Sequence, residues 1–153
     1  MKYWHRFRVR APLARVADFH SRAASLAVLT PPPIIMRLHR APDIQREGDE
    51  VDFTMWLGPL PVRWTARIDS VSETDFVDRQ VRGPFRMWRH RHVYAPIDAD
   101  ATEVTDEVEA ELKRDWLWGA VGALMWLGLR LLFAYRGWKT RRALEGRSKW
   151  AES

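Results

Sequence analysis

The sequence predicts an α+β fold in which a curved antiparallel sheet of about seven strands wraps around one long C-terminal helix. Residues 34–112 repeatedly alternate with the period of two that is typical of strands, and short turns separate the repeats. Two short helical segments precede this series. From Asp115 to Leu144 no proline interrupts a mainly apolar run, which is typical of a helix.

The N-terminal part is expected to form one strand and two short helices. The strand covers residues 3–10, where basic and apolar side chains alternate. Pro12 suits the first turn of a helix, and the two helices are expected over residues 13–20 and 22–29. Thr30 and the prolines after it end the second helix.

Six consecutive strands are then expected, and turns join them into an antiparallel meander. They cover residues 34–40, 50–57, 62–71, 76–82, 85–94 and 102–112. Gly58-Pro59 and Gly83-Pro84 mark two of the turns, because glycine and proline punctuate extended segments.

The last helix is expected to run unbroken from Asp115, a suitable N-cap, to Leu144. Its first half is apolar all round, and such a helix is buried, in a membrane or at an interface. Burial against the sheet is the leading interpretation, because the strands need a cover. A homodimer contact or a peripheral membrane contact through Trp116–Arg142 is the alternative. The cations expected to help that contact are Arg136, Lys139, Arg141 and Arg142.

Length and composition favour a single domain. The chain has 153 residues, of which 46% are hydrophobic, enough for a real core. We expect the domain to cover residues 1–146 and residues 147–153 to be a frayed tail. The chain has no cysteine, which excludes disulfides and thiolate catalysis. With no signal-peptide pattern at the N-terminus, we expect a cytoplasmic protein, with membrane association as the alternative.

The net charge of +5 permits contact with nucleic acid or anionic lipid. The excess is mostly arginine scattered over strand faces and the C-terminal segment, and no zinc-finger, RNP or helix-turn-helix pattern occurs. We therefore expect a solvated basic surface and no nucleic-acid partner. No glycine-rich phosphate loop or serine elbow appears, which argues against nucleotide binding and a serine triad.

Polar and aromatic side chains share strand faces over residues 76–94, as in the wall of a cavity. One face of the second strand carries Trp88, His90, His92 and Tyr94. Strict alternation places Phe85 on the opposite face. Asp78 and Gln80 share a face of the first strand, and they meet the Trp88 face only if the pairing is regular. A bulge at the turn would swap the faces.

His90 and His92 lie about 7 Å apart along their strand, on one face. With Asp106 from the next strand they could bind a metal, act as an acid–base pair, or form a hydrogen-bonded network that orients a ligand. A metal site needs three or four ligands and a second shell, so we expect no metal and no cofactor. Asp106 is expected to pair with His90 or His92, and these three are the candidate catalytic residues.

The residues that carry a family resemblance are Phe76, Asp78, Gln80, Gly83, Pro84, Phe85, Trp88, His90, His92 and Tyr94. Their spacing resembles the signature of the SRPBCC superfamily (START-like, helix-grip), closest to its bacterial cyclase/dehydrase-like branch. Residues 29–32, 102–108 and 133–136 also resemble that branch, so the resemblance covers nearly the whole chain. It implies a helix-grip fold with a pocket between sheet and helix for lipids, polyketides or other apolar molecules. Some members are cyclases or dehydratases, and many only bind or carry.

We therefore expect a small hydrophobic or amphipathic ligand, of lipid, polyketide or aromatic type, between the sheet and the last helix. The alternatives are a cyclase/dehydratase-type enzyme that uses His90 or His92 as acid or base, and a membrane-surface or protein-interaction module that acts through the last helix. The expected ligand-binding residues are Trp56, Trp64, Asp78, Gln80, Phe85, Trp88, His90, His92, Tyr94 and Asp106.

Overall fold

A single curved antiparallel sheet is the centre of the fold in the computed structural model, which describes residues 1–146. The predicted frayed tail, residues 147–153, lies outside the described residues. The strand order is β1-β7-β6-β5-β4-β3-β2, so β2 to β7 form the expected meander and β1 pairs with the outer side of β7. The strands are β1 (Lys2–Val9), β2 (Ile35–Arg40), β3 (Glu50–Leu57), β4 (Leu60–Val71), β5 (Asp75–Arg82), β6 (Phe85–Asp98) and β7 (Ala101–Leu112).

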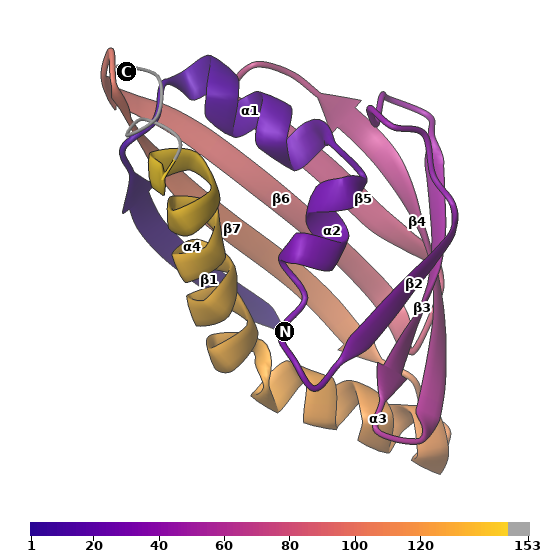
Figure 1. Ribbon diagram of the computed structural model, residues 1–153. Helices are drawn as coiled ribbons and strands as arrows, with labels where there is room; N and C mark the ends of the chain where they lie inside the picture. The colour runs from indigo at the N-terminus through magenta and orange to yellow at the C-terminus, as the bar shows by residue number, and fades with distance from the viewer. Residues whose placement is uncertain (147–153) are drawn as a thin grey trace.

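The helices all lie on the concave side of this sheet (Figure 1). They are α1 (Leu13–Ser21), α2 (Ala24–Val28), α3 (Trp116–Leu127) and α4 (Leu129–Glu145). α1 and α2 cross the middle of the sheet, α4 runs along β1 and β7, and α3 lies at the lower end of the sheet in this view. The predicted α+β class, with about seven strands and two short N-terminal helices, is confirmed.

The C-terminal helix is bent, and the prediction of one unbroken helix is wrong. Asp115 caps α3 as expected, and its carboxylate accepts a hydrogen bond of 2.8 Å from the Trp118 backbone N–H. At Gly128 the chain turns by 49° into α4. Glycine is a poor helix former, so a bend there costs little. The bend allows α4 to pack on β1, where a Cβ on Gly137 would lie 3.3 Å from the Phe7 ring.

A bulge at the start of β6 corrects the predicted position of Phe85. Phe85 pairs with Leu112 and Met87 with Glu111, so β6 holds one extra residue at this point. Phe85 is thereby placed on the Trp88 face, with the two ring centroids 4.8 Å apart, and is only 1% exposed.

The Gln80 side chain stabilises the turn between β5 and β6. Its amide donates a hydrogen bond of 2.7 Å to the Phe85 carbonyl and accepts one of 3.1 Å from the Phe85 N–H. A Cβ on Gly83 would collide with this side chain, so a larger residue there would have to displace Gln80 from the turn. These contacts give Gln80 a structural role at the turn.

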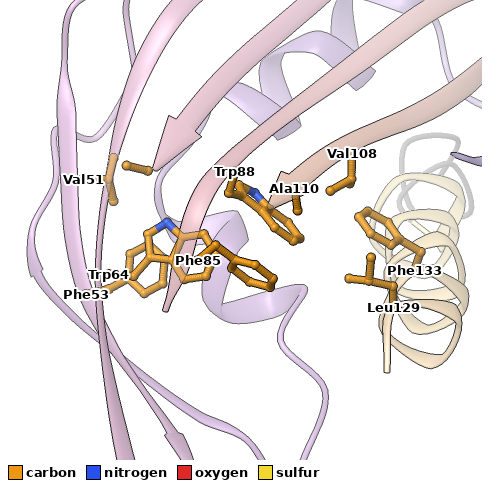
Figure 2. Packing of buried hydrophobic residues seen from close by; sticks show 10 residues of the cluster. Val51, Phe53, Trp64, Phe85, Trp88, Val108, Ala110, Leu129 and Phe133 are labelled. Atoms are coloured by element: carbon orange, nitrogen blue, oxygen red, sulfur yellow. The ribbon is translucent and has the colours of Figure 1, made fainter. Parts of the chain in front are cut away.

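The buried apolar residues form two clusters, separated along the sheet by polar side chains. Figure 2 shows the first cluster, which includes Trp64, Phe85, Trp88, Val108 and Phe133. The second includes Phe7, Ile68, Phe76, Tyr94 and Val104. Along β6, His90 and His92 fall between Trp88 and Tyr94, and along β7 Asp106 falls between Val104 and Val108. The fold therefore places a polar band in the middle of its interior.

Large apolar side chains remain exposed on the outer side of the bent helix pair. Trp116 is 84% exposed, Leu127 78% and Leu131 79%. Within residues 1–146 no single helix is long and apolar enough to cross a membrane; α3 and α4 pass that test only together, as a bent pair, by length and composition. The homodimer or membrane contact through Trp116–Arg142 stays a prediction.

Candidate functional site

A cavity of about 120 Å³ lies between the sheet and the helices. Most of its wall is apolar and includes Phe53, Trp64, Phe76, Trp88, Leu132 and Phe133. Trp88 from β6 and Phe133 from α4 point toward one another across the interior (Figure 2). The polar groups on its wall include His20, Asp78, His90, His92 and Arg136. Apolar rings with a few convergent polar groups are typical of small-molecule sites.

The structure brings part of the predicted site together at this cavity. The predicted residues that line it are Trp64, Asp78, Trp88, His90 and His92. Phe85 and Tyr94 are buried in the two apolar clusters instead, and Gln80 is bound to the turn. Trp56 is 39% exposed and does not line the cavity. β3 turns Phe53 and Met55 toward the cavity, so the alternation of the strand directs Trp56 outward.

Asp106 links the two central histidines. The register places His92 opposite Asp106 on β7, and Asp78 on β5 opposite His90. His90 Nε2 donates a hydrogen bond of 3.1 Å to Asp106 Oδ1. His92 Nδ1 lies 2.6 Å from the same oxygen, although its angle falls outside hydrogen-bond geometry. The predicted pairing of Asp106 with His90 or His92 is confirmed. The sequence left the face of Asp78 open, and the regular β5–β6 register places it on the same face as the histidines.

Burial sets the charge of this band. Burial lowers the pKa of His90 and of His92, so both imidazoles are neutral near pH 7, and Asp106 only partly opposes this effect. Burial alone would raise the pKa of Asp106, but its contacts with His92 and His90 bring that pKa well below the usual range. Near pH 7 the Asp106 carboxylate is therefore ionised, accepts a hydrogen bond from the neutral His90 imidazole and lies beside the neutral His92 imidazole. Because a carboxylate only accepts, His90 carries its proton on Nε2.

Asp78 differs from Asp106 because no residue in 1–146 donates a hydrogen bond to its carboxylate. His90 Nδ1 lies 3.7 Å from Asp78 Oδ2, beyond hydrogen-bond distance. Burial raises the pKa of Asp78 to about 6, although His92 and Arg136 pull it down. Asp78 lines the cavity, so a guest would meet a carboxyl group that gains or loses a proton near neutral pH.

Sequence reasoning missed His20 and Arg136. His20 Nδ1 donates a hydrogen bond of 2.9 Å to the Val16 carbonyl, and its ring lies 4.9 Å from that of His92. Burial lowers the pKa of His20 to about 3, so it is neutral. Arg136 was expected on the surface, but α4 turns it into the cavity one helical turn after Phe133. The period of α4 is the only signal that could have found it.

One cluster offers enough donors for a metal ion. Asp78, His90 and His92 each provide one ligand atom, and these atoms lie within 4.8 Å of one another. Asp106 would act behind both histidines, as outer carboxylates do in zinc sites. The Arg136 cation is close enough to lower the pKa of Asp78, however, and a positive charge there opposes a second cation.

Comparisons with known proteins support the fold. No protein-family model matches the chain, and no curated protein sequence matches it significantly. Among solved structures, the Zhui aromatase/cyclase from Streptomyces sp. R1128 superposes with a TM-score of 0.79 at 14% identity, over 100% of this chain and 98% of that one. Norcoclaurine synthase from Thalictrum flavum, in complex with dopamine and hydroxybenzaldehyde, gives 0.69 at 18% identity over 95% and 87%.

A third similar structure is much longer than this chain. The nucleoside-diphosphate sugar epimerase from Corynebacterium glutamicum gives a TM-score of 0.69 at 25% identity, and the match covers 96% of this chain but 30% of that one. These superpositions agree with the architecture described above, in which a bent helix pair lies on the concave face of a seven-stranded sheet. The chain therefore has the helix-grip fold, which is the fold implied by the resemblance of its sequence to the SRPBCC superfamily.

Proposed function

We propose that the protein binds a small aromatic or amphipathic molecule in the cavity between the sheet and α4. The observation that carries this proposal is the cavity itself, whose aromatic walls meet one group of polar side chains. Burial of a guest's apolar surface against Trp64, Trp88 and Phe133 would supply most of the affinity. The polar groups would orient its polar end.

The size of the cavity favours a guest with one ring. The cavity volume is about 120 Å³, and an engineered apolar cavity of about 150 Å³ binds benzene. The norcoclaurine synthase of similar fold was solved with dopamine and hydroxybenzaldehyde, which are small aromatic molecules. This likeness supports an aromatic guest over a long lipid.

Filling the cavity tests this proposal. Ala66 lines the cavity from β4, so Ala66→Leu adds bulk where the guest would lie. Nitrobenzene is a suitable neutral probe, and burial of one ring gives an expected Kd of about 1 mM. In ¹H–¹⁵N NMR titrations we expect nitrobenzene to shift the indole N–H signals of Trp64 and Trp88 in the wild type. Ala66→Leu should abolish these shifts.

The matched control is Ala95→Leu, the same substitution at an exposed position of β6. It should bind nitrobenzene as the wild type does. Shifts that persist in Ala66→Leu, or that spread over the surface instead of the cavity, would refute the proposal.

Acid–base catalysis is the second candidate function, and Asp78 favours it. Burial raises the pKa of this carboxyl, which lines the cavity, to about 6, close to the value that suits a general base near neutral pH. Asp78 would take a proton from a carbon next to a ketone, and the C–H electron pair would move toward the carbonyl oxygen to give an enolate. His92 would stand beside it as a neutral proton carrier. The aromatase/cyclase of similar fold makes this chemistry worth testing.

Hydrogen–deuterium exchange of phenylacetone in D₂O measures this step directly. We expect the wild type to accelerate exchange, with a rate that rises with pH through about 6 as Asp78 loses its proton. Asp78→Asn should lower the rate about 100-fold or more, and His92→Gln should lower it as well. Asp98→Asn, at the exposed end of β6, should leave it unchanged. Equal rates in the wild type and Asp78→Asn would leave only the binding function.

A further inference from the structure

Arg136 lines the cavity and has no hydrogen-bond or ion-pair partner among residues 1–146. Its Nε is buried and makes no hydrogen bond, and no residue in 1–146 forms a hydrogen bond or an ion pair with its side chain. Its closest aromatic contact is with Phe133, whose ring centroid lies 5.6 Å from the guanidinium carbon. Buried polar groups are nearly always hydrogen-bonded, so an unpaired one calls for an explanation.

The charge of Arg136 cannot be removed by deprotonation. Burial lowers its pKa, while Asp106 and Asp78 act in the opposite direction. A guanidinium nevertheless stays charged in proteins, because its ordinary pKa is so high. An uncompensated buried charge is strongly destabilising, so an anion that entered the cavity would find a favourable partner.

The interior carboxylates of Asp78 and Asp106 do not serve as the partner of Arg136. Asp106 is already held by His90 and His92. Asp78 forms no ion pair with Arg136, and with a pKa of about 6 it carries less than a full charge in mildly acidic solution. His20 is neutral and donates a hydrogen bond through Nδ1 to a backbone carbonyl, so it is not a second cation that would attract an anion away from Arg136. None of these groups therefore occupies the N–H donors of the guanidinium.

We propose that Arg136 is the anchor for a carboxylate on the bound molecule, so that the ligand is a one-ring aromatic acid. This inference rests on the proposed binding function and names the class of its ligand. The planar fork of a guanidinium matches a carboxylate through two parallel hydrogen bonds. A monoanion fits better than a dianionic phosphate ester, because the mainly apolar wall penalises each additional charge.

Benzoate and nitrobenzene test this inference, since they share shape and size and differ in charge. In NMR titrations of the wild type we expect benzoate to bind at least about 10-fold more tightly than nitrobenzene. Arg136→Met should weaken benzoate binding by about 10- to 100-fold and leave nitrobenzene within about threefold. The matched control is Arg130→Met, an exposed position of the same helix, which should change neither affinity.

The outcomes separate this inference from the proposed function. If nitrobenzene binds in the cavity but benzoate shows no preference, or Arg136→Met does not weaken benzoate, the carboxylate anchor is wrong and the cavity function stands. If neither molecule binds the wild type, both proposals fail. Should circular dichroism show Arg136→Met unfolded, Arg136→Lys decides instead: it keeps the charge but not the fork, and an unchanged benzoate affinity would refute the bidentate anchor.

Discussion

Replacing Asp106 with alanine is expected to lower the free energy of unfolding by about 3–5 kcal/mol. The carboxylate is almost completely buried and lies within 3.1 Å of His90 Nε2 and 2.6 Å of His92 Nδ1. Its removal leaves the His90 Nε2–H group in the interior without its acceptor and opens a small void between the apolar clusters. Urea denaturation followed by tryptophan fluorescence measures the change.

The control for this prediction is Glu111→Ala, which removes an exposed carboxylate from the same strand. Glu111 forms a surface ion pair of 3.6 Å with Arg86, and such pairs contribute less than about 1 kcal/mol. A similar small loss for Asp106→Ala would mean that water reaches the histidines and replaces the carboxylate. The polar band would then be an open, hydrated channel and not a structural element.

The sheet could be predicted because its signal is local. In β4, Val62, Trp64 and Ile68 face the core while Arg63 and Arg67 face solvent, so burial and polarity alternate in the sequence itself. The pairing of Asp106 with the histidines followed from the same logic, since consecutive strands of a meander are neighbours. The bend at Gly128 could not be predicted in this way. α3 contains other glycines at which the helix continues, so a glycine by itself does not locate the bend, and the packing of α4 on β1 is a contact between distant parts of the chain.

The site was harder to predict because its residues come from distant parts of the chain. His20 reaches His92 only after α1 folds over β6, a contact that no local pattern encodes. Arg136 carries a charge, and charged side chains are mostly exposed, so the sequence pointed to the surface. Trp56 was selected for its aromatic ring, although the alternation of β3 already directed it outward. For Trp56, the residue type suggested a place in the site, whereas its position in the alternation of the strand indicated correctly that it faces outward.

Acidification from pH 7 to pH 4.5 is expected to lower the free energy of unfolding by about 2–4 kcal/mol. Burial lowers the pKa of His20 to about 3 and also lowers the pKa values of His90 and His92. In the unfolded chain each imidazole takes up a proton near pH 6.5. Below that pH the unfolded state binds more protons than the folded state. The stability that the neutral histidines contribute is therefore complete above about pH 6.5 and decreases as the pH falls.

Asp78 opposes the loss of stability at low pH, and Asp106, Tyr94 and Arg136 contribute little to the pH dependence in this range. With a pKa of about 6, Asp78 takes up its proton in the folded state before it does so in the unfolded chain, which cancels about one of the three histidine protons. The pKa of Asp106 is well below its usual range, so its contribution is lost only as the pH falls below about 4. Tyr94, whose pKa is raised, stays neutral, and Arg136 stays charged. The unfolded state therefore binds at most about two more protons than the folded state. Each of these protons changes the free energy of unfolding by about 1.4 kcal/mol per pH unit.

Urea denaturation at several pH values between 7 and 4.5 measures this slope, and a histidine variant assigns it. His20→Gln should lower the slope by up to about one proton, because the group that gains a proton on unfolding is gone. His39→Gln, which removes an exposed histidine of β2, should keep the wild-type slope. Stability that does not change with pH over this range would mean that the three histidines titrate normally in the folded protein. Water would then have to reach the cavity wall freely, and a dry site for an aromatic guest could not exist there.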